Sequence, residues 1–191
     1  MTPDELTRTG GISAAKPDWS REAKQFWAWI PSRSLLASIR SYQSHRGSPN
    51  PLRIGLRMLA TLRHMFWSIV TGADVPLNCQ IDGGMAMPHP NGIVIHPDAT
   101  IGPNCMLLQQ VTIGERNGAV PTLGGHVDVG AGAKVLGAVH IGDHANIGAN
   151  AVVLQDVPPG ATAVGVPARI ADTRRIEESR VNTSPRGILP D

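Results

Sequence analysis

An aspartate and a histidine that stand fifteen residues apart, Asp74 and His89, could form a general-base pair. The histidine lies in the run PHPNG (residues 88–92), whose prolines and glycine predict a turn that leaves the imidazole projecting. A carboxylate that holds one imidazole nitrogen leaves the other free to take a proton from a hydroxyl group. A single histidine in a turn is more often a solvated surface residue. The spacing alone therefore leaves both interpretations open.

The elements that must position this pair carry a six-residue repeat, in which aliphatic residues recur in two runs separated by an insertion. The repeated residues are Ile95, Ile101, Leu107, Ile113, Leu123, Val129, Val135, Ile141, Ile147 and Val153. An α-helix would need a period of about 3.6 and a single strand a period of about 2. Hexads are typical of a triangular coil that places one repeat on each face. The sequence therefore predicts a mainly β fold, a left-handed parallel β-helix over residues 73–172, rather than a β-sandwich with coincidental spacing.

Two irregularities interrupt the repeat. A weaker frame, offset by two residues, precedes it at Val75, Ile81, Met87 and Ile93. Between the two runs, residues 115–121 exceed what one hexad can hold, so we expect them to project outward as a recognition loop.

Because one coil takes three hexads, the spacing of Asp74 and His89 is nearly one turn. The pair is therefore predicted to lie on adjacent coils near the same corner.

Residues 1–72 are predicted to form a small α-helical region. Asn50 is suited to an N-cap, a proline follows it, and apolar residues then recur at helical spacing until Gly72. We expect a second helix over residues 32–43 and a shorter one over residues 22–29.

The four tryptophans of the chain all lie in this N-terminal region. Aromatic residues at helical spacing usually belong to a core, so we expect them to pack the helices together and onto a neighbour. At the other end, residues 173–191 are polar and are expected to form a flexible tail.

The composition argues against several function classes. A net charge of +2 is too small to predict nucleic acid or an acidic membrane as a partner. Cys79 and Cys105 do not form a CxxC pair, which argues against zinc and disulfide exchange, and free buried thiols fit a reducing compartment. Basic residues interrupt the longest apolar stretch, residues 52–70, and the first residues lack an apolar signal region. We therefore expect no membrane span and a cytoplasmic location.

The repeat region also carries longer motifs in a fixed order. These motifs are TGADVP, PHPNGIVIHPDATIG, QQVTIG, VGAGAKVLG, IGANAVVLQDVPPG and AVGVPARI. With them, the chain resembles the serine acetyltransferases, a branch of the hexapeptide-repeat acyltransferases, from about residue 52 to residue 171. In that family the segment matching TGAD supplies an aspartate, and the turn matching PHPNG supplies the catalytic histidine. The resemblance therefore implies that Asp74 and His89 are the catalytic pair.

The resemblance further implies an acetyl-CoA-dependent O-acetyltransferase that acetylates L-serine to give O-acetylserine for cysteine synthesis. The histidine would deprotonate the acceptor hydroxyl during direct transfer, so neither a covalent acetyl-enzyme nor a metal is required. Acetyl-CoA would lie between neighbouring subunits of a homotrimer. Lys134 and Arg169 would lie near its phosphates. The positions that match the family's CoA contacts are Gly114, Ala131, Gly132, Ala133, Lys134, Ala149 and Arg169.

The chain departs from the family at positions that face the acceptor. Ala119 and Val120 stand in the outward loop where the family carries Arg-His, and Pro88 replaces the aspartate before the catalytic histidine. The acidic residue of the family's N-terminal helices has only Asp18 as a candidate counterpart. A free amino acid needs partners for its charges. These departures leave open a second acceptor class, the hydroxyl of a sugar, a polysaccharide unit or an antibiotic.

Two alternatives lie outside the transferases. A metal lyase on the same fold needs three converging histidines, and the spacing of the seven histidines does not predict them. A non-enzymatic scaffold is the other alternative, because β-helices also serve as assembly surfaces. Some serine acetyltransferases dock a sulfhydrylase through a terminal isoleucine, and the last residues of this sequence do not match that signal.

Overall fold

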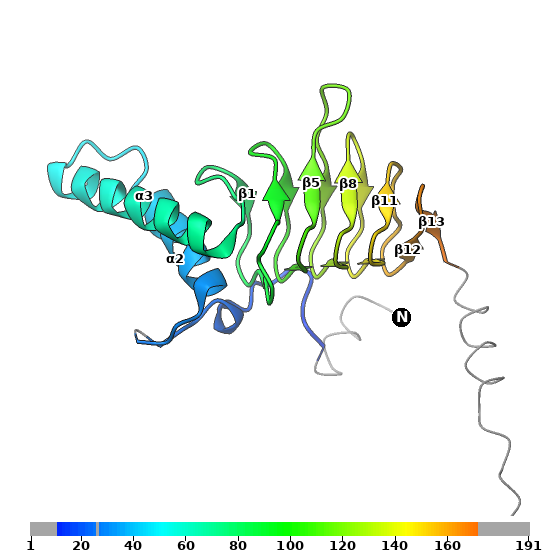
Figure 1. Ribbon diagram of the computed structural model, residues 1–191, viewed down its shortest axis with the longest axis horizontal. Coiled ribbons are helices and arrows are strands. Elements are labelled where there is room, and N and C mark those ends of the chain that lie inside the picture. The colour runs from blue at the N-terminus through cyan, green and yellow to red at the C-terminus, as the bar shows by residue number, and fades with distance from the viewer. Residues whose placement is uncertain (1–10, 26, 172–191) are drawn as a thin grey trace, which may run out of the picture.

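The computed structural model describes residues 11–25 and 27–171. The flexible tail predicted over residues 173–191 lies outside the described residues. Two helices stand at one end of a long stack of short strands (Figure 1). Within the described ranges, no helix combines the length and the apolar character needed to cross a membrane.

The longer helix, α3 (Pro51–Thr71), begins and ends where the sequence predicts. The side-chain oxygen of Asn50 accepts a hydrogen bond from the Leu52 N–H at 2.9 Å, and the proline in the first turn needs no N–H acceptor. The helix ends at Gly72, whose φ of 65° is left-handed and whose N–H donates to the Ser68 carbonyl.

The second helix, α2 (Pro31–Ser44), confirms the one predicted over residues 32–43, and it packs against α3. The helix predicted over residues 22–29 is wrong. A single 3-10 turn, η2 (Trp19–Arg21), precedes that stretch, and the described residues within it are not helical. The proline that begins α2 contributes to this outcome, because a residue before proline is pushed out of the helical region. Ile30 accordingly has φ −127° and ψ 87°.

The tryptophans pack only in part as expected within the single chain: the Trp29 ring, just before α2, contacts the Trp67 ring of α3, with centroids 5.2 Å apart. Trp19, Trp27 and Trp29 are 56%, 80% and 71% exposed, and of the four only Trp67 packs against the core. Helix α3 also leaves most of its apolar side chains in solvent, and the fully buried helical side chains of the core, Leu35, Leu36 and Ile39, come from α2. Packing of these aromatic residues onto a neighbouring chain stays a prediction.

The strands form three faces of a prism. Face A consists of β2 (Val94–Ile95), β5 (Thr112–Gly114), β8 (Lys134–Leu136) and β11 (Val152–Val153). Face B consists of β1 (Gln80–Ile81), β3 (Thr100–Ile101), β6 (Thr122–Leu123) and β9 (His140–Ile141). Face C consists of β4 (Met106–Leu107), β7 (Asp128–Val129), β10 (Asn146–Ile147) and β12 (Thr162–Val164), and β13 (Arg169–Ile170) closes it as an antiparallel strand. All other pairs are parallel, so the predicted parallel β-helix is confirmed.

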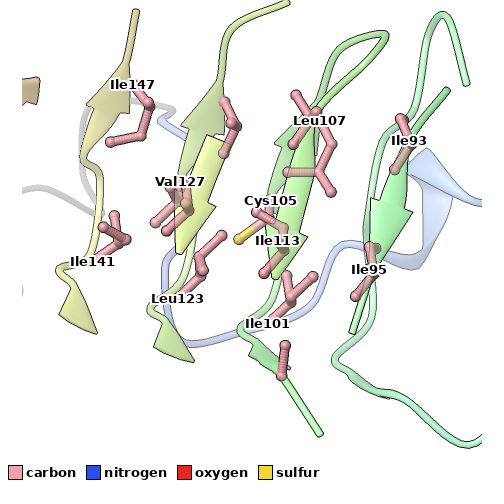
Figure 2. Close-up of a cluster of buried hydrophobic side chains, with 14 of the residues drawn as sticks. Ile93, Ile95, Ile101, Cys105, Leu107, Ile113, Leu123, Val127, Ile141 and Ile147 are labelled. Carbon is pink, nitrogen blue, oxygen red and sulfur yellow. The ribbon is translucent and has the colours of Figure 1, made fainter. Parts of the chain in front are cut away.

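Each aliphatic residue of the repeat stacks on its equivalent one coil away. On face A, Ile95 pairs with Ile113 eighteen residues later, and on face B Ile101 pairs with Leu123. Figure 2 shows these side chains, with Cys105 among them, gathered inside the prism. The weaker frame is buried as well, at Val75, Ile81, Met87 and Ile93. One continuous apolar core therefore runs along the prism axis.

The corners of the prism turn through residues with left-handed φ. Between faces B and C these residues include Asn104, His126 and His144, with φ of 62°, 52° and 59°. Between faces C and A they are Gly92, Gln110, Gly132 and Asn150, with φ of 68°, 59°, 72° and 57°. The turns that contain the second set, residues 88–92, 108–111, 130–133 and 148–151, are called the C–A edge below.

The predicted outward loop is a tight hairpin. Arg116 and Ala119 form an antiparallel bridge around Asn117 and Gly118, whose φ values of 57° and 76° suit the primed turns of two-residue hairpins. The hairpin is exposed and projects beyond β5 (Figure 1). The strands on either side keep their register, because the extra residues are contained in the loop.

Candidate active site

The turn that carries His89 belongs to the C–A edge. It follows Ala86, which bridges to β4 of face C, and it precedes β2 of face A. The turn is anchored at Gly92, whose N–H donates to the Gly72 carbonyl at 2.9 Å. The His89 side chain is exposed, as the sequence predicts for a histidine in a proline-flanked turn.

Asp74 lies one coil before this turn, on face A. Its N–H donates to the Ile93 carbonyl at 2.8 Å, and its own carbonyl accepts from the Ile95 N–H at 2.9 Å. The Asp74 backbone is therefore in register with Val94, just beyond the His89 turn. Both side chains are exposed, and no hydrogen bond joins them among the described residues. The proposed contact between carboxylate and imidazole stays a prediction.

Three of the predicted donor-side residues lie at accessible positions of the same C–A edge, beyond the 108–111 turn. Ala131 and Ala149 occupy equivalent places on successive coils, and the Asn150 N–H donates to the Ala131 carbonyl at 2.8 Å. Gly132 has a left-handed φ, and an added Cβ would lie 2.2 Å from the Asn150 Oδ1. The small residues thus satisfy a packing requirement, and they leave the backbone of this edge accessible.

Two further donor-side candidates lie on face A, next to this edge. Lys134 begins β8, and its Nζ donates to the Gln110 carbonyl at 2.6 Å, so the ammonium is held against the C–A edge. Gly114 ends β5, where an added Cβ would lie 3.1 Å from a Leu136 methyl carbon.

The last two donor-side candidates have different settings. Ala133 is fully buried, its N–H donates to the Gly130 carbonyl, and its carbonyl accepts from the Thr112 N–H. Both of its backbone groups are engaged in the prism, which favours a packing role. Arg169 is exposed on β13, where the closing hairpin pairs it with Val164.

Comparisons with known proteins point in one direction, although no protein-family model matches the chain. A serine acetyltransferase of Synechocystis sp. is 39% identical over 167 residues, which cover 85% of this chain and 66% of that protein. A solved serine acetyltransferase in complex with CoA has a TM-score of 0.62 at 33% identity, over 75% of this chain and 57% of the other. The Neisseria gonorrhoeae enzyme in complex with serine has a TM-score of 0.59 at 31% identity, over 74% and 55%.

The chain is a homologue of the serine acetyltransferases. It spans less than two thirds of the length of each of these relatives. The family resemblance drawn from the motifs is thus confirmed by overall sequence identity and by fold.

The structure also places the positions at which this homologue departs from the serine acetyltransferases. Ala119 and Val120 are half-buried where the chain returns from the exposed hairpin, and Pro88 is exposed at the start of the His89 turn. Asp18 is the N-cap of η2. Hydrogen bonds from the Ser20 hydroxyl and N–H, with a smaller effect of the Arg21 charge, hold the pKa of Asp18 below its usual range. Its carboxylate therefore has a local structural function.

The two cysteines are poor candidates for a nucleophile. Both are buried, and burial raises the pKa of Cys79 to about 11 and that of Cys105 to about 12. A thiol with so high a pKa carries almost no thiolate at neutral pH. This supports a reaction without an acetyl-cysteine intermediate.

Among residues 11–25 and 27–171, no group of three or more His, Cys, Asp or Glu side chains is arranged to hold a metal ion.

One polar group that sequence reasoning missed lies on the C–A edge. The Gln109 Oε1 is buried and has no hydrogen-bond partner in the described part of the chain, although the Gln109 carbonyl accepts from the Gly132 N–H. A glutamine in a repeat region carries no signal that would single it out.

Proposed function

We propose that the chain is an acetyl-CoA-dependent O-acetyltransferase in which His89 is the general base. One observation carries this proposal: the His89 turn and the small residues Ala131, Gly132 and Ala149 share the C–A edge, with the 108–111 turn between them. A pantetheine arm that lies along this edge would run toward the turn that holds the histidine. The homology to serine acetyltransferases, one of them solved with CoA, supports the same reaction.

In the proposed reaction, His89 takes the proton of the acceptor hydroxyl while the hydroxyl oxygen attacks the acetyl carbonyl carbon. The bond from that carbon to sulfur then breaks, the acetyl group stays on the acceptor, and the imidazolium returns its proton to the leaving thiolate. Asp74 stabilises the imidazolium through its negative charge. Backbone N–H groups stabilise the oxyanion that forms during the attack.

L-Serine is the first acceptor that we propose. The product would then be O-acetylserine, a precursor for cysteine synthesis. The homology supports this choice, because one matching structure contains serine. A sugar-type hydroxyl is the second candidate. Ala119, Val120 and Pro88 favour it, because none of these side chains can meet the charges of a free amino acid.

We also propose that the chain acts as a homotrimer with the donor between neighbouring subunits. The exposed apolar side chains of α3, together with Trp27 and Trp29, support an association of this kind. Light scattering on the purified chain should then give three times the mass of one chain. The cytoplasmic location expected from the sequence stays a prediction.

Thiol release from acetyl-CoA tests the reaction. Purified protein is incubated with acetyl-CoA and L-serine, and then with sugar acceptors, and the acetylated product is identified by mass spectrometry. His89→Ala should lower turnover by roughly 10²–10⁴-fold, the usual contribution of a general base. His140→Ala is the matched control, because His140 is an exposed histidine on face B. Near-normal turnover of His89→Ala would refute the assignment.

A further inference from the structure

A cavity of about 310 Å³ lies between the first turn of α2 and the first coil of the prism. Its polar lining consists of Arg21, Ser32 and Arg33, and its wall on the prism side ends at Pro88. Pro88 is bonded directly to His89, so the cavity adjoins the turn that carries the candidate general base. No motif or period of the sequence groups these residues.

The N-terminus of α2 opens into this cavity without a cap. Ile30 holds the N-cap position and has no side chain that could accept a hydrogen bond. The N–H groups of Ser32 and Arg33 donate no hydrogen bond within the described ranges. Unpaired N–H groups and the helix dipole together favour an anion at such a terminus.

The Ser32 hydroxyl adds a second kind of donor to the cavity lining. Ser32 is only 9% exposed, it lines the cavity, and no partner for its hydroxyl is found among the described residues. The other buried serines of α2 are satisfied, since Ser34 donates to the Ile30 carbonyl and Ser38 to the Leu35 carbonyl. The Ser32 hydroxyl is not among the solvent-inaccessible unsatisfied atoms, so it is reachable from the cavity and free to donate to a group that binds there.

The charge of the lining has one sign. Arg21 donates to the Asn104 carbonyl and Arg33 to the Ala23 carbonyl, and each guanidinium has further N–H groups to donate. Neither forms an ion pair in the described part of the chain, whereas Arg40 nearby pairs with Glu22. No carboxylate lines the cavity, so its lining carries two positive charges and no negative one.

We propose that this cavity binds an anionic group, a carboxylate or a phosphate, of the hydroxyl acceptor. The proposal rests on the proposed acetyl transfer, and it supplies a partner for acceptor charge that the outward hairpin does not provide. Ser32, Arg33 and the N-terminus of α2 hold the anion, and the remainder of the acceptor extends past Pro88 toward His89. Anchoring a remote anionic group in this way positions the hydroxyl at the base.

A direct titration tests the site without any turnover. Inorganic phosphate is titrated by calorimetry into the full chain saturated with CoA, so that the donor phosphate sites are already filled. Loss of a hydrogen bond to a charged group weakens binding by roughly tenfold or more. Ser32→Ala and Arg33→Gln should each show this loss, whereas Arg53→Gln, which removes an exposed charge on α3, should bind like the unchanged protein. Phosphate binding that is unaffected by Arg33→Gln would overturn the proposal.

Kinetics then distinguish the two sources of the anion. L-Serine, glucose 1-phosphate and neutral glucose are compared as acceptors with Arg33→Gln and the charge-conserving Arg33→Lys. For an acceptor anchored in the cavity, KM should rise about tenfold in Arg33→Gln, recover partly in Arg33→Lys, and leave kcat and the KM for acetyl-CoA within about twofold. The acceptor that shows this pattern identifies the anion as carboxylate or phosphate.

The two proposals can fail separately. If no acceptor is acetylated, the proposed function fails, and the phosphate titration still decides whether the cavity is an anion site. If acetylation is observed but Arg33→Gln raises only the KM for acetyl-CoA, the reaction stands and the cavity serves the donor, which refutes its assignment to the acceptor.

Discussion

The Nδ1 atoms of His126 and His144 lie 2.8 Å apart at the corner between faces B and C. The two rings are nearly perpendicular, with centroids 5.0 Å apart and an interplanar angle of 78°. At this distance one nitrogen donates its proton and the other accepts, so the pair cannot carry protons on both of these atoms. The arrangement therefore disfavours the fully protonated state that acid produces.

Stability should fall in mild acid because of this pair. Burial lowers the pKa of His126 from its ordinary 6.5, and the His144 and Arg21 charges act in the same direction against the opposing Asp128. As the pH falls below 6.5, the unfolded chain takes up a proton that the folded chain resists, so the free energy of unfolding decreases. Urea denaturation at pH 7.5 and pH 5.5 measures this loss.

His126→Asn should make that loss smaller. Asparagine tolerates the left-handed φ of 52° at this position, and Asn104 already occupies the equivalent place one coil earlier. His140→Asn, on an exposed strand residue, is the control and should leave the pH dependence unchanged. An identical loss of stability in His126→Asn and the unchanged protein would contradict this explanation.

The ion pair between Glu22 and Arg40 should be a major attachment of the N-terminal segment. Glu22 is 8% exposed at its side chain, lies 2.9 Å from Arg40, and accepts hydrogen bonds from the Gly84 and Met85 N–H groups. Removing one partner of a buried pair typically costs about 3–5 kcal/mol. Glu22→Ala should lower the free energy of unfolding by about 3 kcal/mol in urea, and Glu22→Leu combined with Arg40→Met should regain part of it. A change below about 0.5 kcal/mol, typical of an exposed pair, would show that the contact is dispensable.

Two glycine substitutions should shift stability in opposite directions. An added Cβ at Gly102 would lie 2.6 Å from the backbone carbonyl of Gly124 on the next coil, which cannot move without opening the stack. Gly102→Ala should therefore destabilise the chain by about 1–3 kcal/mol, as overpacking does. At Gly55, in α3, nothing lies within 4 Å of an added Cβ, so Gly55→Ala should stabilise by up to about 1 kcal/mol. Thermal unfolding of both variants checks the two signs, and equal shifts would contradict the packing explanation.

The elements that could be predicted are those encoded by short-range periodicity. The six-residue repeat predicts that the side chains of Ile113 and Leu123 point inward. This prediction needs only the local sequence, because each hexad forms one face of one coil and the same residue of every hexad points inward. Asn50 and Gly72 mark the ends of α3 because capping depends on immediate neighbours.

The features that could not be predicted depend on contacts distant in sequence. A short helix is expected over residues 22–29, but the Glu22 carboxylate pairs with Arg40 and accepts a hydrogen bond from the Gly84 N–H of the first coil. The cavity brings Ser32 and Arg33 beside Pro88, and no sequence period relates these positions. The sequence places Asp74 and His89 on adjacent coils, but it does not determine the orientation of their side chains.

The hairpin around Asn117 and Gly118 has a practical consequence. It leaves the prism after Gly114 and returns before Thr122, and Ile113 and Leu123 on either side remain in register with the neighbouring coils. Its length is therefore decoupled from the geometry of the stack. A foreign peptide grafted at this tip should leave the scaffold intact, which makes the hairpin an insertion point for affinity tags, fluorescent reporters or loops transplanted from serine acetyltransferases.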